Sequence, residues 1–68
     1  MKPSSAAVLS YMKKYGSVTP IEALKHCGTM RLGARIFDLR EDGYRIKSRL
    51  VSVRTRNGTA RVARYTLA

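Results

Sequence analysis

The spacing of apolar residues changes at Gly43, and this change constrains the fold more than any other feature of the sequence. Before Gly43, Leu32, Ile36 and Leu39 recur at intervals of four and three residues, the spacing of one helical face. After Gly43, apolar and basic residues alternate, as in a half-buried β-strand. The pattern therefore predicts an α+β fold in which helices come first and strands second.

The first helix is expected over residues 4–15. Ser4 or Ser5 can cap its beginning, and Gly16 can end it. Residues 1–3 are then a short arm. The buried side of this helix is expected to hold Val8, Tyr11, Met12 and Tyr15.

The second helix is expected over residues 20–27, after a short extended link. Thr19 suits the N-cap position, and Pro20 suits the first helical position, where its missing N–H costs nothing. Glu22, three residues after the cap, completes a capping box. Gly28 ends the helix. The residues expected in the core are Ile21, Leu24 and Cys27.

The third helix is expected over residues 30–42, capped by Thr29 and ended by Gly43. A tight turn at residues 28–29 joins it to the second helix. This arrangement is that of a DNA-binding helix-turn-helix unit, whose second helix enters the major groove. We therefore interpret 30–42 as a candidate recognition helix. Its apolar stripe leaves Arg31, Ala34, Arg35 and Asp38 on a different face. The alternative is that Arg31 and Arg35 are solvated charges, with Asp38 as the partner of Arg35.

Residues 44–67 are expected to form a two-stranded antiparallel hairpin. A two-residue turn at residues 57–58 would place Arg64 on the core face, so a loop of three or five residues is expected instead. A shift of parity along the first strand predicts a bend or bulge near residues 48–49. The expected core face is Val51, Val53, Ala63, Tyr65 and Leu67, and the expected outer face is Ser52, Arg54, Arg56, Val62, Arg64 and Thr66.

The charge balance points to a polyanionic partner. The 68 residues carry 14 Lys and Arg against 4 Asp and Glu, a formal net charge of +10, and no acid follows residue 42. Such self-repulsion destabilises a compact chain, and a polyanion would relieve it.

The chain is expected to be a single domain over 1–68, too small for a substrate cavity beside its core, so no small-molecule ligand is expected. A membrane partner is not expected either, because the densest charge lies in the strands.

Neither catalysis nor metal binding is expected. His26 and Cys27 are the only residues of their types, and as helical neighbours they point about 100° apart. One histidine and one cysteine cannot assemble a zinc site, and no cofactor motif is present. Glu41 and Asp42 are interpreted as surface charges. A lone cysteine and no long apolar run predict a cytoplasmic protein, or a nucleoid-associated one in a cell without a nucleus.

Three helices followed by a basic two-stranded hairpin make the architecture of a winged helix-turn-helix domain. The runs T-P-I-E-A-L, M-R-L-G-A-R-I-F-D-L-R-E-D-G-Y-R-I and V-R-T-R-N-G-T-A-R-V-A-R-Y-T-L resemble the small winged helix-turn-helix domains of bacteriophage and prophage proteins. The resemblance extends from about Val8 to Leu67, and its most specific part is 35–46. It implies a DNA-binding winged helix without assigning individual contacts.

DNA binding would need phosphate contacts for affinity and base contacts for sequence preference. The residues expected on phosphates are Thr19, Arg54, Arg56, Arg61 and Arg64, and the tip at Arg56 and Asn57 can alternatively enter the minor groove. The residues expected near base edges are Thr29, Met30, Arg31, Ala34, Arg35 and Asp38.

The expected partner is double-stranded DNA, and the expected role is a transcriptional regulator of a phage or prophage promoter. One alternative is an excisionase-like architectural protein that bends or coats DNA. Another is a protein-interaction module, in which the wing docks on an acidic host protein and inhibits it. A host or phage protein is therefore a further possible partner. Double-stranded RNA is a further possible ligand, since phosphate contacts alone do not distinguish it.

Overall fold

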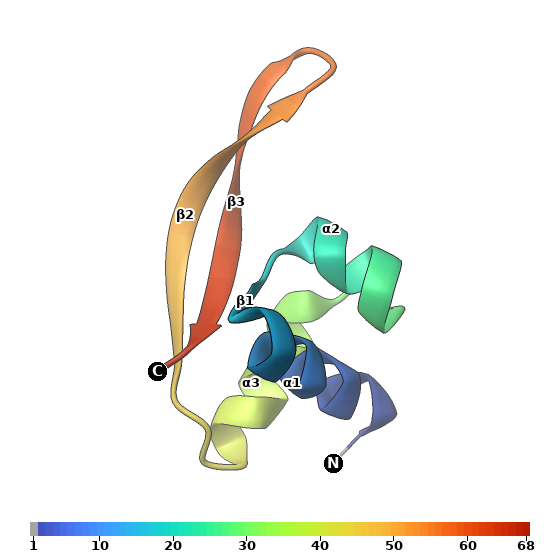
Figure 1. The fold of residues 1–68 in the computed structure, drawn as a ribbon, viewed down its shortest axis with the longest axis vertical. Helices are drawn as coiled ribbons and strands as arrows, with labels where there is room; N and C mark the ends of the chain where they lie inside the picture. The colour runs from blue at the N-terminus through green and yellow to red at the C-terminus, as the bar shows by residue number, and fades with distance from the viewer. Residues whose placement is uncertain (1) are drawn as a thin grey trace.

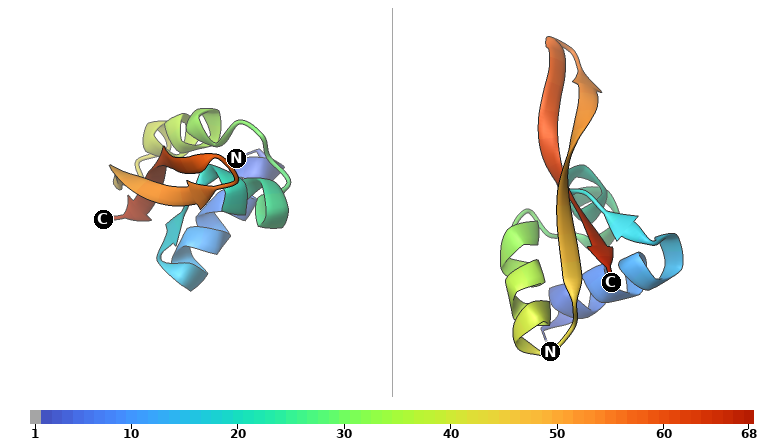
Figure 2. Two further views of the ribbon diagram at one scale, coloured as in Figure 1. Left: turned by 90° about the horizontal axis from the view of Figure 1, so that it is seen from above. Right: turned by 90° about the vertical axis from the view of Figure 1, so that its left-hand side faces the viewer.

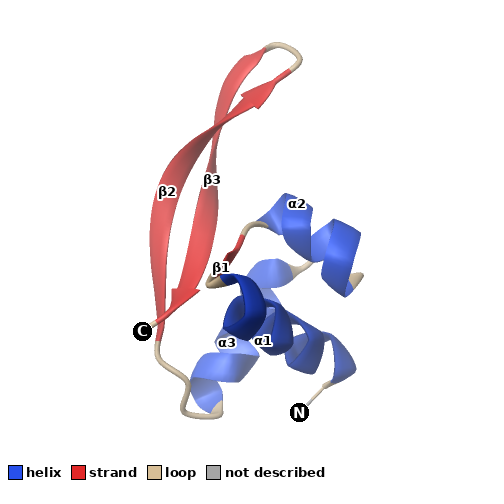
Figure 3. Cartoon of the chain, in the orientation of Figure 1, coloured by secondary structure: helices blue, strands red, loops and turns tan. Residues whose placement is uncertain are grey.

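The computed structural model describes residues 2–68, which fold into a helical body with a long projecting hairpin (Figure 1). The elements are α1 (Pro3–Tyr15), β1 (Ser17–Val18), α2 (Pro20–Glu22), η1 (Ala23–Cys27), α3 (Leu32–Glu41), β2 (Ile46–Thr55) and β3 (Gly58–Leu67). Helices gather at one end of the hairpin, and the other end extends beyond them (Figure 3). The predicted α+β class, with three helices before an antiparallel hairpin, is confirmed.

Helix α1 begins earlier than its serines suggested. Pro3 is its first residue and Lys2 is the N-cap, without a side-chain cap hydrogen bond. Ser5 does not cap the helix, because its side chain is fully buried against α3. Gly16 ends the helix in the left-handed conformation, with a φ of 91°, as predicted. The buried apolar residues of α1 are Val8, Leu9 and Met12; Tyr11 is half-buried and Tyr15 is exposed. Of the predicted arm, Met1 lies outside the described residues.

The link after α1 is a strand of the sheet. β1 pairs antiparallel with β3, Ser17 opposite Thr66 and Val18 opposite Tyr65, which gives the order β1-β3-β2. Val18 is fully buried. Pro20 favours an extended backbone at Thr19, the residue that follows the strand. The sheet therefore has three strands, where the sequence analysis expected only the hairpin.

The second helical segment follows the predicted bounds, but it buries different residues. It begins as α2 and continues as the π-helical turn η1, which ends at Gly28. Ala23 is fully buried, whereas Ile21 and Leu24 are 57% and 48% exposed. Ala23 and Cys27 are four residues apart on one side, and Ile21 and Leu24 lie on another. Only one pair can face α1, where the Cys27 thiol lies 3.7 Å from the carbonyl oxygen of Ala7. The predicted burial of Ile21 and Leu24 is therefore wrong.

Helix α3 starts at Leu32, two residues later than predicted. The Thr29 hydroxyl accepts the backbone N–H of Arg31 at 3.2 Å, and this bond holds residues 29–31 in a turn before the helix. The end at Gly43 is as predicted: its φ is 99°, and its N–H donates to the carbonyl of Arg40 at 3.0 Å. The predicted apolar stripe is buried and consists of Leu32, Ile36 and Leu39.

Strands β2 and β3 turn at Arg56 and Asn57. Their pairing runs without interruption from the base of the hairpin to Thr55 opposite Gly58. The turn therefore has two residues instead of the predicted three or five, and residues 48–49 contain no bulge. A turn at 57–58 would have placed Arg64 on the core face. A turn one position earlier changes every cross-strand pair, so that Tyr65 faces the core and Arg64 does not.

This register separates residues that the sequence analysis placed on one face. Val51 lies opposite Val62, so these two share a face. Tyr65 and Leu67 lie on the other face and pack against the core. Val53 and Ala63 are separated in the same way, because Val53 pairs with Ala60. A long two-stranded ribbon twists strongly, and Figures 1 and 2 show the strands crossing. Its apolar pairs can therefore lie on different faces at the base and farther out.

Candidate nucleic-acid interface

The exposed beginning of α3 follows from the turn before it. Thr29 is buried, and its hydroxyl is used within the turn. Met30, the next residue, is 86% exposed. Arg31 is exposed at the N-cap, with no side-chain hydrogen bond to the helix. The structure therefore leaves Met30 and Arg31 accessible at one end of α3.

Arg35 does not lie on an exposed face of α3. Its Nη1 donates to the Ser4 hydroxyl of α1 at 3.2 Å. Its Nε lies 3.2 Å from Asp38 Oδ2, at ion-pair distance but without hydrogen-bond geometry. The side chain is only 18% exposed. The prediction that Arg35 shares an exposed face with Arg31 is wrong, because packing of α3 against α1 turns this side inward.

Asp38 joins the same contact between α1 and α3. Its Oδ2 accepts the hydroxyl of the fully buried Ser5 at 3.3 Å. Lys2 Nζ lies 3.8 Å from the same oxygen. Like Arg35, Asp38 therefore connects the two helices, while Ala34 beside them is half-buried.

The open side of α3 carries Phe37, which the sequence analysis did not select. Phe37 is 61% exposed and lies one turn after Gly33. A Cβ placed on Gly33 would meet no atom within 4 Å, so this side of the helix faces open space. Phe37 lies off the apolar stripe, and this mismatch was the signal available in the sequence. Arg40 is also exposed, but its Nη2 donates to the carbonyl of Ile46 at 2.8 Å.

The hairpin divides the predicted phosphate contacts between its two faces. Strand alternation and the observed register place Arg54 and Arg61 together on one face. Arg64 lies on the other face, directly opposite Arg49. The predicted outer face is wrong in this respect, because it placed Arg54 and Arg64 together. Of the residues predicted on the outer face, Val62 and Thr66 share a face with Arg64, and Ser52 shares a face with Arg54. Arg56 lies in the turn.

The turn and both arginine pairs are free of acidic partners. Arg56 and Asn57 are exposed at the tip, which Figure 1 shows far from the helical body. Among residues 2–68, the ion pairs are those of Asp38 with Lys2 and Arg35. No carboxylate therefore neutralises the hairpin arginines, and their full charge is available to an anion.

Thr19 lies at the beginning of α2 but is buried. Its hydroxyl accepts the N–H of Glu22 at 3.4 Å and donates to Glu22 Oε1 at 3.2 Å. The Thr19 N–H donates to the same carboxylate oxygen at 2.9 Å. The predicted capping box is thus confirmed, and the hydroxyl is occupied within it.

The side chains of Cys27 and His26 contact different residues of α1. Burial raises the pKa of the Cys27 thiol, which favours the protonated, unreactive form. The His26 ring stacks on Tyr11, with centroids 5.5 Å apart.

Residues 2–68 contain no group of three side chains that could ligate a metal ion. In the same part of the chain, no helix is long and apolar enough to cross a membrane.

Comparison with known proteins agrees with this geometry. A family model described as "Winged helix-turn-helix domain" matches residues 4–68, nearly the whole chain. A comparison with curated proteins finds no match.

Proposed function

The chain belongs to the winged helix-turn-helix domain family, and we propose that it binds double-stranded DNA through α3 and the β2–β3 hairpin, the wing. Domains of this family are typically DNA-binding and non-catalytic. The observation that carries the proposal is the exposed side of α3 together with a wing whose arginines pair with no acidic residue among residues 2–68. A polyanionic duplex supplies the missing negative charge.

Base contacts are assigned to the accessible residues of α3. Arg31 can grip guanine O6 and N7 with two hydrogen bonds. Met30 and Phe37 are exposed apolar groups, suited to contact with thymine methyl groups. Gly33 between them lets a base edge approach the helix backbone. Arg35 is left out, since its guanidinium is engaged by α1.

Phosphate contacts are assigned to the wing. Arg54 and Arg61 share one face and can contact successive backbone phosphates. Arg56 and Asn57 at the tip can reach into the minor groove, where narrow A·T tracts attract arginine. Thr19 and Thr29 receive a supporting role, because both are buried and fix the helix starts.

The proposed role is regulation of transcription at a phage or prophage promoter. This role is supported by the resemblance of the sequence to small phage winged helices. An excisionase-like architectural role uses the same contacts. A bend detected by gel-mobility phasing, or cooperative coating of tandem sites, would favour the architectural role over regulation.

The wing assignment is tested by the salt dependence of binding to a short fluorescent duplex. The logarithm of the affinity is expected to fall linearly with the logarithm of salt concentration, with a slope of about −0.9 per phosphate contact. Arg54→Ala, Arg56→Ala and Arg61→Ala should each reduce the slope by about 1 and weaken all sequences alike. Lys13→Ala removes the same charge from the end of α1 as a matched control. Equal losses in the control and the wing variants would contradict the assignment.

A second candidate function rests on an exposed apolar hollow of about 190 Å³. Pro20, Ile21, Leu24 and Met30 line it. Clustered apolar exposure is typical of protein-binding surfaces. A protein-interaction module should retain a bacterial protein from nuclease-treated lysate, and Ile21→Ser with Leu24→Ser should abolish retention. Retention that depends on nucleic acid would leave DNA binding as the function.

A further inference from the structure

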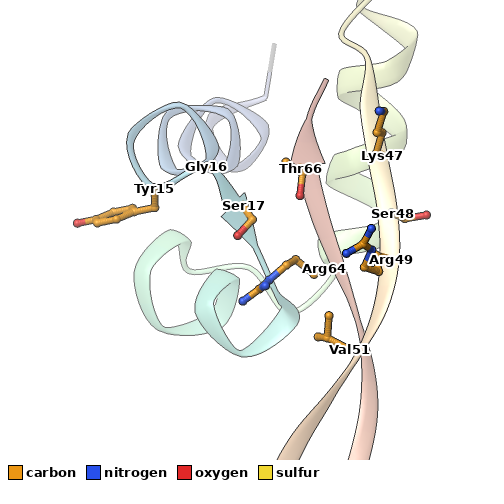
Figure 4. Close-up of a pocket in the computed structure, with 9 residues that line it drawn as sticks. All are labelled: Tyr15, Gly16, Ser17, Lys47, Ser48, Arg49, Val51, Arg64 and Thr66. Atoms are coloured by element: carbon orange, nitrogen blue, oxygen red, sulfur yellow. The ribbon is translucent and has the colours of Figure 1, made fainter.

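A second basic surface lies on the side of the sheet that faces away from the helices. A hollow of about 550 Å³ occurs there, lined by residues of α1, all three strands and the Gly16 turn. Figure 4 shows Ser17, Arg64 and Thr66 around it on one side and Lys47 and Arg49 on the other. We call this region the outer hollow.

Strand alternation explains why these side chains face outward. Val18 and Tyr65 pack in or against the helical core. Their neighbours Ser17 and Thr66 must therefore point to the opposite side of the sheet. Lys47 pairs with Thr66 and shares that side, so a row of two hydroxyls and one ammonium crosses three strands.

The next row of the same face holds two arginines. Arg49 and Arg64 are directly opposite each other in the antiparallel pair. Like charges in this position destabilise a hairpin, and no carboxylate lines the hollow to offset them. Guanidinium groups and hydroxyls are donors suited to phosphate oxygens. The site is therefore complementary to a phosphate group.

The outer hollow is distinct from the proposed recognition surface. Arg54 and Arg61 lie on the opposite face of the same hairpin. Since most residues that line the hollow are exposed, a small anion would be largely solvated in it. A polymer of phosphates can instead make several contacts at once. The charge distribution therefore favours a second DNA backbone over a free anion.

We propose that the outer hollow binds the phosphate backbone of a second duplex, so that one copy of the chain joins two DNA segments. The proposal rests on the DNA binding proposed above for α3 and the wing. Arg49 and Arg64 supply the main contacts, with Lys47 beside them and Ser17 and Thr66 as hydroxyl donors.

The test is a bridging assay with one duplex fixed to beads and a second, fluorescent duplex in solution. Wild-type protein should retain the second duplex. Lys47→Gln with Arg49→Gln should reduce retention by roughly tenfold or more at about 0.1 M salt, because each lost phosphate contact releases about 0.9 fewer counterions. The affinity of this variant for a single short duplex should stay within about twofold of wild type, since the recognition surface is unchanged.

The matched control is Arg54→Gln with Arg61→Gln, which removes the same charges from the opposite face. It should lower the affinity for a single duplex, which the hollow variant does not. Thermal unfolding of the hollow variant checks its fold, and its midpoint should not fall, because a like-charge pair has been removed.

Two outcomes would overturn the bridging proposal while leaving the proposed function intact. One is wild-type protein that binds a single duplex without retaining a second. The other is unchanged retention by the hollow variant, which would assign bridging to self-association. Amide shifts at Arg49 and Arg64 on titration with inorganic phosphate, without retention of a second duplex, would reassign the hollow to a small anion. Failure to bind any duplex would remove both proposals.

Discussion

Replacing Asp38 with alanine should destabilise the fold and leave DNA sequence preference unchanged. The Asp38 carboxylate accepts the buried Ser5 hydroxyl at 3.3 Å and lies 3.2 Å from Arg35 Nε. Removing it leaves the hydroxyl of the fully buried Ser5 and the mostly buried Arg35 guanidinium without their anionic partner. This loss falls between α1 and α3, on the side of α3 that is not available to DNA.

The size of the loss follows from the burial of the pair. An exposed ion pair contributes about 0.2 to 1 kcal/mol, whereas breaking a fully buried pair costs about 3 to 5 kcal/mol. The side chains of Arg35 and Asp38 are 18% and 29% exposed, between these limits. We therefore expect the free energy of unfolding to fall by about 2 kcal/mol, which for a domain of this size lowers the melting temperature by about 8 to 16 °C.

The assay is thermal and urea unfolding of Asp38→Ala beside Glu41→Ala. Glu41 is exposed on the same helix, so its removal changes the net charge equally and should change the free energy of unfolding by less than about 0.5 kcal/mol. The double variant Arg35→Met with Asp38→Leu should recover part of the loss, because an apolar pair leaves no buried charge. Equal stability of the Asp38 and Glu41 variants, with an altered DNA preference only for Asp38→Ala, would contradict a structural role for Asp38 between α1 and α3.

Three further results are expected. Thr19→Ala should lower the free energy of unfolding by about 1 kcal/mol in urea titration through loss of the cap, and an unchanged midpoint would contradict the capping role. Phe37→Ala should leave the melting temperature within a few degrees of wild type while weakening binding to the preferred duplex by about 1 kcal/mol, measured by fluorescence anisotropy; equal weakening on every sequence would argue against base contact. Burial raises the pKa of the Cys27 thiol. The stability that the buried, protonated thiol gives the fold is therefore present below the ordinary thiol pKa and is lost as pH rises through the raised value. Alkylation of the Cys27 thiol at pH 8 should therefore be slower in the folded than in the unfolded protein, and equal rates would contradict the raised pKa.

Local signals in the sequence predicted local structure well. The capping box at Thr19 and Glu22 and the left-handed ends at Gly16 and Gly43 need only neighbouring residues. The stripe of α3 was also predictable, because a period of 3.6 residues fixes which side chains share a face. These elements were sufficient for the order of helices and hairpin.

The hairpin register could not be predicted in the same way. Moving the turn from 57–58 to 56–57 changes every cross-strand pair, and local residue preferences do not distinguish these positions strongly. The alternation of apolar residues predicted one apolar face along the whole hairpin. A twisted ribbon instead has Val51 and Val62 on one face and Tyr65 on the other.

Local spacing offered the Arg35–Asp38 ion pair as an alternative, but it could not predict which side of α3 faces α1. Arg35 is four residues from Arg31, a spacing that suggests a shared basic face. The partner that removes Arg35 from this face is Ser4, distant in sequence, on α1. The exposed Phe37 was missed for the same reason, since an apolar residue off the main stripe has no assigned side until the helices are packed.

Selection from a pool of random duplexes at two salt concentrations tests the central proposal most directly. Wild-type protein should enrich one sequence motif at the higher salt, where nonspecific phosphate binding is weakened. Arg31→Ala and Phe37→Ala should change the preference at particular positions of that motif, whereas Arg56→Ala should lower binding without changing it. Binding that collapses with salt and enriches no motif would contradict base recognition by α3.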